Sequence, residues 1–407
     1  MTVVASLIGD SPVILWSLSS RDRLKRQLSS VDISIVDSTE TEPQASHQLL
    51  VRCDFLYELR SFKALLQKDS FFLMDNQGQE LAAALVPTEQ AETVQRVMVQ
   101  QLEQKTSGQE ESLLQNLPAD IPRGGREQLG AYDSKLRRAD LPILEPLSPE
   151  RSQYLEDQLY GNSYKGITDL VTKWLWPQLA KRLVRFCARR AITPNQVTGV
   201  SFALTLVAGY LFYLGLFGWG LLAAWVMTLL DTVDGKLARV RVEASKLGHL
   251  FDHGIDLVSP PFWYLLWAMG LAHWGLNANL PLVTTLIFSG YIAGRLEELA
   301  FQKICGGSVF AWRPFDSWFR LVTARRNPCL IILTTALLLS SPWVGLWGVI
   351  VWTLGTTGVL WVRLAQALEA RRHLGKQLPS WLEEPDAEDK YPQSYPVFSG
   401  TQGAYKS

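Results

Sequence analysis

Apolar segments and basic loops alternate through the second half of the sequence, and this pattern constrains the fold more than any other feature. A helix that crosses a membrane needs roughly 20 mainly apolar residues. Six segments approach or reach that length: 197–217, 219–233, 255–274, 280–301, 328–341 and 343–364. The sequence therefore predicts an all-α, multi-pass integral membrane domain with six transmembrane helices.

The loops around these segments fall into two classes. Lys and Arg are concentrated in 181–190, 236–246, 303–327 and 363–376, whereas the alternate loops contain neither residue. Cytoplasmic loops of membrane proteins carry an excess of positive charge. We therefore expect both termini and residues 229–256 on the cytoplasmic side, which is the cytoplasmic face of the inner membrane in a bacterial source.

The segment 164–198 precedes the first apolar segment and interleaves aromatic with basic residues. Trp174, Trp176 and Phe186 alternate with Lys173 and the basic residues of 181–190. This pattern is typical of a helix that lies on the membrane surface, with its basic residues toward anionic head groups of the lipids. A soluble amphipathic helix packed on another domain is the alternative. The formal net charge of the chain is zero, so no basic bias points to nucleic acid.

Four aspartates lie between the second and third apolar segments: Asp231, Asp234, Asp252 and Asp256. Their spacings of three and four residues place each pair on one face of a helix. Because the two segments are antiparallel neighbours, their facing ends can bring the pairs together. Nearby carboxylates repel one another unless cations share the site, and hard ions such as Mg²⁺ or Mn²⁺ prefer oxygen ligands. The alternative is an acidic loop in solvent.

Small residues and one arginine accompany the aspartates. Gly235, Ala238 and Gly248 allow a backbone or a ligand to approach closely. Arg239 supplies a fixed positive charge that suits phosphate. The residues thus indicate a cation site beside a phosphate-binding surface.

The whole pattern, D-x-x-D-G-x-x-A-R, eight residues, then G-x-x-x-D-x-x-x-D, resembles the signature of the CDP-alcohol phosphotransferases. The resemblance extends over residues 164–370. These membrane enzymes displace CMP from a CDP-linked alcohol, usually CDP-diacylglycerol, with the hydroxyl group of a second alcohol. The resemblance implies a transferase of phospholipid or polar-lipid biosynthesis that forms a homodimer through its membrane helices.

The resemblance also implies roles for individual residues. Asp231, Asp234 and Asp252 would bind two divalent ions, and Asp256 would take the proton from the acceptor hydroxyl and also contact a metal ion. The cytidine and phosphate pocket would be formed by Gly235, Ala238, Arg239, Gly248, Thr193, Pro194, Asn195 and Thr198. A plain helix start is the alternative for 193–198, with Thr193 as N-cap and Pro194 at the first helical position. Both interpretations can hold together.

Two groups of charged residues are candidates for binding the acceptor. Arg295, Glu297 and Glu298 lie in the fourth apolar segment, where ionisable groups are costly and usually functional. They are close to its cytoplasmic end, so extension of the side chains to water is the alternative. Arg325 and Arg326 suit the phosphate of a phosphorylated acceptor, and surface charge of the positive-inside kind is the alternative for them.

Residues 1–105 alternate short apolar strands with amphipathic helices, which predicts a small α/β domain with a mainly parallel sheet. Parts of this domain resemble a sugar-nucleotide cytidylyltransferase, as it occurs in bifunctional inositol-phosphate cytidylyltransferase/di-inositol-phosphate-phosphate synthases. The glycine-rich basic loop of that fold is missing from 7–14, and Asp54 alone matches a metal-binding position. We expect a degenerate nucleotidyltransferase-like domain that serves docking or regulation.

The remaining boundaries follow from composition. We expect a linker with some helix over 106–163, the membrane domain over 164–375 and a disordered tail over 376–407. Two other functions remain open at this point. The chain could be a bifunctional enzyme that also makes its own CDP-alcohol, or a transporter that binds cations. The position of the aspartates at a membrane face, instead of at mid-depth, disfavours the transporter.

Overall fold

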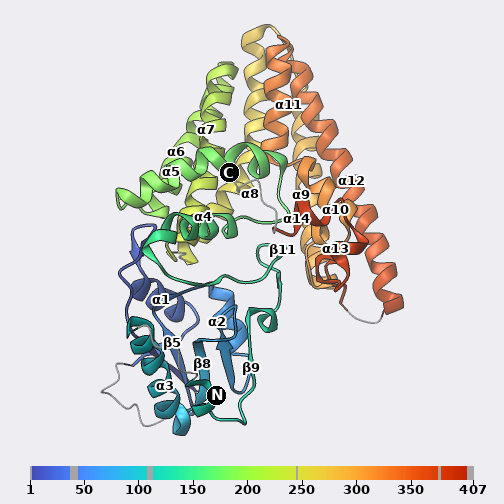
Figure 1. Ribbon diagram of the computed structural model, residues 1–407. Helices are drawn as coiled ribbons and strands as arrows, with labels where there is room; N and C mark the ends of the chain where they lie inside the picture. The colour runs from blue at the N-terminus through green and yellow to red at the C-terminus, as the bar shows by residue number, and fades with distance from the viewer. Residues whose placement is uncertain (1, 37–44, 108–112, 244–245, 375–376, 401–407) are drawn as a thin grey trace. The chain divides into compact units, whose positions relative to one another are not determined.

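The structure is a computed structural model that describes residues 2–36, 45–107, 113–243, 246–374 and 377–400 (Figure 1). Of residues 106–107, 246–247 and 249–253 it describes the backbone only. The chain forms two compact units. Unit 1 consists of Met1–Asp133, Asp140–Asn162 and Val240–Val242, and unit 2 consists of Ser134–Ala139, Ser163–Arg239 and Glu243–Ser407.

Unit 1 is built on a six-stranded mixed sheet with the strand order β4-β1-β5-β8-β7-β9. Its strands are β1 (Val3–Ile8), β4 (Ser34–Ile35), β5 (His47–Arg52), β7 (Phe71–Met74), β8 (Leu81–Pro87) and β9 (Arg123–Gly124). Strand β8 runs antiparallel to both of its neighbours, and the other pairs in the sheet are parallel. The expected α/β domain is therefore present, with a mixed sheet in place of a mainly parallel one.

Helices cover both faces of this sheet. Helices α1 (Ser20–Ser29) and α2 (Leu59–Leu65) pack on one face, and α3 (Thr88–Ser107) packs on the other. Alternate residues of β5 supply the two cores: Leu49 faces α1 and α2, whereas Leu50 faces α3. The strand period of two thus produces a three-layer arrangement.

Much of the segment expected as a linker belongs to unit 1. Strand β9 extends the sheet at its edge, and β12 (Leu144–Pro146) pairs antiparallel with β6 (Phe55–Tyr57). Helix α4 (Ser152–Asn162) follows, and the buried indole of Trp16 donates a hydrogen bond of 3.0 Å to the carbonyl of Glu156 in that helix.

Unit 2 is helical. Its long helices are α5 (Trp176–Arg189), α6 (Pro194–Tyr213), α7 (Phe217–Val240), α8 (Lys246–Gly270), α9 (Leu280–Cys305), α10 (Pro314–Val322), α11 (Arg326–Leu338) and α12 (Pro342–Leu374). Each of the six expected spans overlaps one of these helices over most of its length. Helix α7 continues seven residues past the expected end at 233, to Val240, so Asp231 and Asp234 lie inside a helix.

Close approach of α6 and α8 defines the core of unit 2. The Phe217 and Trp267 rings stack with their centroids 4.1 Å apart, and the Trp263 indole donates a hydrogen bond of 2.9 Å to the Thr205 carbonyl. At Gly270 an added Cβ would lie 1.9 Å from the Phe212 carbonyl oxygen. Only glycine fits at this crossing.

Two helices in the described part of the chain, α6 and α12, are long and apolar enough to cross a membrane by length and composition. The bent pair α10 and α11, with an angle of 45° between them, makes a third candidate. Large apolar side chains such as Leu206, Leu338 and Val351 are more than half exposed on these helices. Such faces are expected on a membrane protein, because lipid takes the place of water around them.

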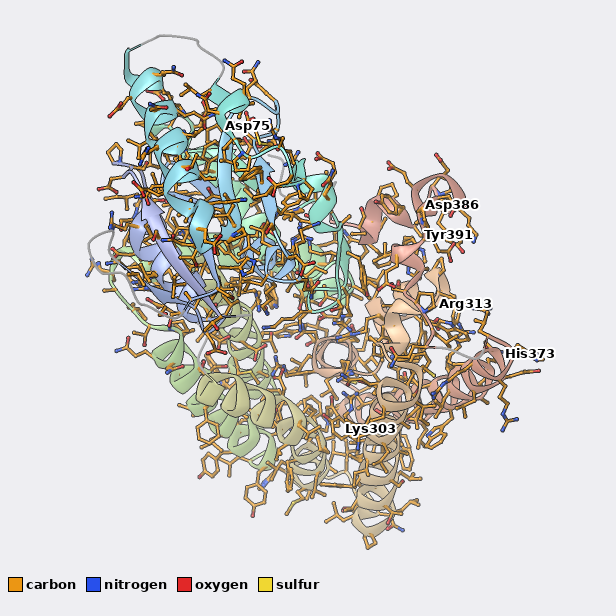
Figure 2. The ribbon with its side chains drawn as sticks, turned by 90° about the horizontal axis from the view of Figure 1, so that it is seen from below. Asp75, Lys303, Arg313, His373, Asp386 and Tyr391 are labelled. Atoms are coloured by element: carbon orange, nitrogen blue, oxygen red, sulfur yellow. The ribbon has the colours of Figure 1, made fainter. Side chains whose placement is uncertain are left out.

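The C-terminal segment differs from the disordered tail expected from composition. Residues 377–400 form η7 (Trp381–Glu383), α13 (Ala387–Lys390) and α14 (Tyr395–Phe398) beside α10, as Figures 1 and 2 show. The Trp381 indole donates a hydrogen bond of 2.9 Å to the Ser317 hydroxyl, and Phe398 is fully buried. Buried aromatic side chains therefore hold the tail on unit 2.

Candidate active site

Helix α7 carries the first two aspartates. Because the helix is unbroken through Val240, Asp231 and Asp234 share one face. Asp234 is buried, with 4% of its surface exposed, and accepts a hydrogen bond of 2.7 Å from the Thr198 hydroxyl on α6. The side chain of Asp231 is 20% exposed and is therefore closer to solvent.

Helix α8 carries the second pair. The side chain of Asp256 is 41% exposed, so a substrate hydroxyl can reach it. The Tyr291 hydroxyl on α9 lies 3.3 Å from the backbone carbonyl of Asp256. Asp252 lies one turn earlier on α8, and its side chain is outside the described residues.

One guanidinium group joins the two helices. Arg326, on the first turn of α11, binds the Asp231 carboxylate through Nη2 at 2.6 Å and the Asp256 carboxylate through Nη1. Its side chain is 12% exposed. Carboxylates from α7 and α8 therefore converge on a single positive charge, as the antiparallel arrangement of the two helices predicts.

The start of α11 is fixed by neighbouring segments. The Asn327 side-chain amide donates hydrogen bonds to the Asp169 carboxylate at 3.0 Å and to the Thr172 hydroxyl at 3.2 Å. The Ala324 amide donates a hydrogen bond of 3.2 Å to the Thr356 hydroxyl on α12. These bonds hold the break between α10 and α11 and thereby position Arg326.

The sequence 193–198 forms the start of α6. Thr193 is the N-cap, Pro194 occupies the first turn, and Thr193 and Gln196 form a reciprocal capping box. The helix-start interpretation is therefore confirmed. Thr198, one turn further, binds Asp234, so this helix start also touches the aspartate cluster. Asn195 is exposed beside it.

The expected phosphate-binding residues lie along α7 and α8. A Cβ at Gly235 would be 3.0 Å from Nη2 of Arg239, so the arginine side chain folds back over the glycine. Arg239 is exposed and Ala238 is half-buried one turn after Asp234. Gly248 lies on the first turn of α8.

The acceptor candidates from the sequence divide into two groups. Arg295 and Arg325 both pair with Glu298, Arg295 at 3.0 Å. Arg326 pairs with the aspartates instead. Glu297 points away from this network: it is fully buried, and neither carboxylate oxygen has a hydrogen-bond partner among the described residues.

Two lysines near the site were missed by sequence analysis. Lys236 is buried between the aspartate motif and the segment before α5, where its ammonium group donates a hydrogen bond of 3.1 Å to the Ser163 carbonyl and lies 3.3 Å from the Tyr164 ring centroid. Its position directly after Asp234 and Gly235 is the only signal that the sequence offers.

Lys165 is the second missed lysine, and it precedes the part of the chain that carries the motif. Loss of hydration is the main cause that lowers the pKa of Lys165 to about 7, together with the charges of Arg137, Arg239 and Arg320, although the side chain is exposed to solvent. Asp256 acts in the opposite direction. Several positive charges therefore gather near Lys165 and Asp256.

The arrangement fits divalent cations. The Arg326 guanidinium lies between Asp231 and Asp256, which shows that one positively charged group can bind both carboxylates. Among the side chains that the structure describes, no three His, Cys, Asp or Glu residues gather closely enough to form a metal site. The Asp252 side chain is not among those described, so the four-aspartate set stays a prediction.

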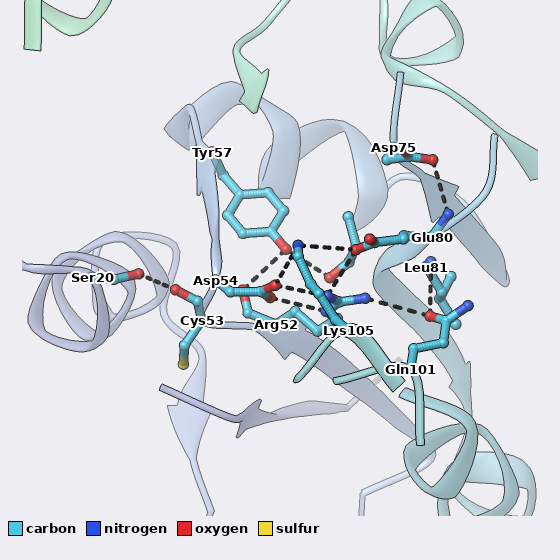
Figure 3. Close-up of polar contacts among 11 residues, drawn as sticks. Ser20, Arg52, Cys53, Asp54, Tyr57, Asp75, Glu80, Leu81, Gln101 and Lys105 are labelled. Carbon is cyan, nitrogen blue, oxygen red and sulfur yellow. Dashed lines mark hydrogen bonds and ion pairs between the residues drawn. The ribbon is translucent and has the colours of Figure 1, made fainter. Parts of the chain in front are cut away.

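Unit 1 contains a separate ion cluster at Asp54 (Figure 3). The fully buried Arg52 binds Asp54 at 2.7 Å and Glu80 at 2.8 Å, and Lys105 lies 3.3 Å from Asp54. Hydrogen bonds to Arg52 are the main stabilising cause that lowers the pKa of Asp54, against the opposing effect of burial. The carboxylate at the expected metal position is thus neutralised by two side chains of the protein.

A helical unit with exposed apolar faces is typical of a membrane protein, and two of its helices carry aspartates that bind one guanidinium group. Comparison with known families agrees with this class. Residues 191–354 match the family described as CDP-alcohol phosphatidyltransferase. The match includes α6 to α11 and every aspartate of the motif.

Several curated proteins are similar to part of the chain. Cholinephosphotransferase 1 of Gallus gallus is 31% identical over 128 residues, which are 29% of this chain and 37% of that protein. Archaetidylinositol phosphate synthase of Pyrococcus horikoshii is 41% identical over 83 residues, 20% of this chain and 44% of that protein. The bifunctional IPC transferase and DIPP synthase of Thermococcus kodakarensis is 27% identical over 139 residues, 30% of this chain and 32% of that protein. The chain thus spans less than half of the length of these relatives.

Proposed function

We propose that the chain is an integral membrane transferase that moves a phosphoalcohol group from a CDP-alcohol to the hydroxyl group of a second alcohol and releases CMP. The observation that carries this proposal is the convergence of Asp231 and Asp256 on one cation within the CDP-alcohol phosphatidyltransferase domain. CDP-diacylglycerol is the donor we favour, for synthesis of a phospholipid or another polar lipid.

The proposed cation ligands are Asp231, Asp234, Asp252 and Asp256, with two Mg²⁺ or Mn²⁺ ions. When bound, such ions polarise phosphoryl oxygens and neutralise the charge that develops on a leaving phosphate. Burial of Asp234 and its bond to Thr198 fix one carboxylate in orientation before any ligand arrives.

The chain's own residues divide the remaining work. Asp256 accepts the proton of the acceptor hydroxyl at its carboxylate, for which its exposure is suited. Arg239 folds over Gly235 and offers its guanidinium to the donor phosphates, while Ala238 and Gly248 leave room for the cytidine. Thr193, Pro194 and Asn195 border this pocket at the start of α6.

We place the acceptor on the opposite side, beside α9 and α11. Tyr291 touches Asp256, and the guanidinium of Arg295 lies 5.2 Å from the Tyr291 ring centroid. Glu298 binds Arg295 and Arg325 together. This places two cations near the proposed base, where a phosphate on the acceptor would compete with Glu298 for them.

The proposed topology has six spans, with both termini and the active site on the cytoplasmic side. Helices α7, α8 and α9 are each long enough to cross a bilayer, at 24, 25 and 26 residues. Helix α5 has exposed Leu179 and Phe186 among basic residues, which suits a place on the membrane surface. We also expect a homodimer that forms through the membrane helices.

Unit 1 is proposed as a degenerate nucleotidyltransferase-like domain, because Asp54 is neutralised by Arg52 and Lys105. A second activity has a direct test. The full chain, incubated with CTP, a divalent ion and inositol phosphate, is expected to release no pyrophosphate. Release that disappears in Asp54→Asn would show a bifunctional enzyme instead.

The transferase is tested by CMP release from CDP-diacylglycerol with Mg²⁺ or Mn²⁺ and a panel of acceptors: glycerol 3-phosphate, inositol phosphate and diacylglycerol. Asp256→Asn is expected to lower turnover by about 10²–10⁴-fold with little change in CDP-lipid binding. Asp69→Asn, which changes an exposed aspartate of unit 1, is the matched control. Near-normal turnover of Asp256→Asn refutes the general base, and cation flux in vesicles without any CMP release indicates a transporter.

A further inference from the structure

The guanidinium of Arg326 occupies the position between the two motif helices. It binds Oδ2 of Asp231 at 2.6 Å with one nitrogen and Oδ1 of Asp256 with the other. The hydrogen bonds of Asn327 hold the first turn of α11 in place and thereby fix the position of Arg326. Its neighbour Arg325 has the same charge and points to Glu298 instead.

These bonds have an electrostatic reason. Two carboxylates that lie within reach of one guanidinium repel each other, and a positive charge between them removes that repulsion. A forked guanidinium satisfies both because its nitrogens point in two directions at once. The oxygens that Arg326 uses are the same oxygens that a cation between the helices would need. Arg326 and such a cation therefore compete for these oxygens.

We propose that Arg326 is an exchangeable counter-ion, which holds the aspartate site together in the metal-free protein and is displaced when a divalent cation binds. The proposal rests on the proposed function only in the identity of the cation site, because it makes no use of the transfer step. It assigns Arg326 to the regulation of metal binding, whereas the sequence suggested that Arg326 binds the acceptor. It is a positioning residue and takes no part in bond formation.

The proposal makes an unusual prediction for metal affinity. If Arg326 competes with the metal ion, Arg326→Gln tightens Mn²⁺ binding, because the ion no longer has to displace the guanidinium from Asp231 and Asp256. We expect about a tenfold lower Kd, the change that corresponds to about 1.4 kcal/mol. Arg326→Lys keeps the charge and loses the fork, so its Kd is expected to lie between those of the wild type and Arg326→Gln.

Arg325→Gln is the matched control. It removes the same charge at the neighbouring position, from a side chain that binds Glu298. Its Kd for Mn²⁺ is expected to change by less than about twofold, since screening weakens charges that do not touch the site. Binding is measured on the full chain in detergent by electron paramagnetic resonance of free Mn²⁺, without any substrate.

A second measurement separates folding from binding. In the presence of a chelator, Arg326→Gln is expected to have a lower melting temperature than Arg325→Gln, and Mn²⁺ is expected to raise it by a larger increment than in the wild type. Should Arg326→Gln not fold, Arg326→Lys carries the same comparison. Weaker or unchanged Mn²⁺ binding in the Arg326 variants overturns the proposal, as does a wild-type protein that binds no Mn²⁺. Tighter Mn²⁺ binding by the variants of a protein that releases no CMP supports the proposed role of Arg326 and refutes only the proposed transferase activity.

Discussion

Replacement of Thr198 by valine tests whether α6 orients the aspartate site. The change removes the hydroxyl that donates a hydrogen bond of 2.7 Å to the buried Asp234 carboxylate and nearly conserves the side-chain volume. A hydrogen bond to a charged group contributes about 1.5–3 kcal/mol to stability. Loss of a partner that orients a metal ligand typically weakens metal binding by about 10–100-fold. We therefore expect both a lower melting temperature and a higher Kd for Mn²⁺.

Thr205→Val is the matched control on the same face of α6, two turns away. Thr205 is buried to a similar degree, and among the described residues its hydroxyl donates to the Ser201 carbonyl, at 3.0 Å. Removal of that bond leaves the aspartates untouched, so Mn²⁺ affinity is expected to stay within about twofold of the wild type. Equal effects of the two variants on Mn²⁺ affinity would refute the idea that Thr198 orients Asp234.

The other perturbations test packing and charge. Gly270→Ala places a Cβ 1.9 Å from the Phe212 carbonyl oxygen and is expected to destabilise unit 2 by about 1–3 kcal/mol or more, whereas Gly218→Ala, where the structure shows open space, is expected to be neutral in the same thermal melt. Because the folded pKa of Lys165 is lowered to about 7 from 10.5, the folded protein binds fewer protons than the unfolded chain between these values, and stability is expected to rise with pH from about 7 toward 10.5. Lys165→Met is expected to flatten the rise of melting temperature with pH. An unchanged slope in this variant would contradict the role of Lys165.

Hydropathy and charge predicted where helices form more reliably than where they end. Each apolar segment lies mainly on a helix of unit 2, because a helix satisfies the backbone hydrogen bonds within the segment itself. The expected span 219–233 ends before α7 does, because the polar residues after 233 do not break a helix. The helix continues through Asp234 to Val240 and carries both aspartates on one rigid face.

Spacing within the motif predicted that Asp231 and Asp234 share one face of a helix. The antiparallel arrangement of the two segments predicted that carboxylates of both helices approach each other, as Asp231 and Asp256 do. The sequence could not show which cation they meet. Arg325 and Arg326 are adjacent and chemically identical, and the break between α10 and α11 turns one toward Glu298 and the other toward Asp231. Lys236 was missed for a related reason: its partner, the Ser163 carbonyl, lies 73 residues away in the sequence.

The C-terminal segment shows why composition failed where spacing succeeded. Proline, serine and acidic residues are frequent in 377–400, and an average over the segment predicts disorder. Order here depends on a few anchors: Trp381 and Phe398 are buried, and the Ser380 hydroxyl donates a hydrogen bond of 2.8 Å to the Ala311 carbonyl. Each anchor acts on α10 or the turn before it, next to the break that positions Arg326. The tail therefore packs on α10, the helix that precedes this break.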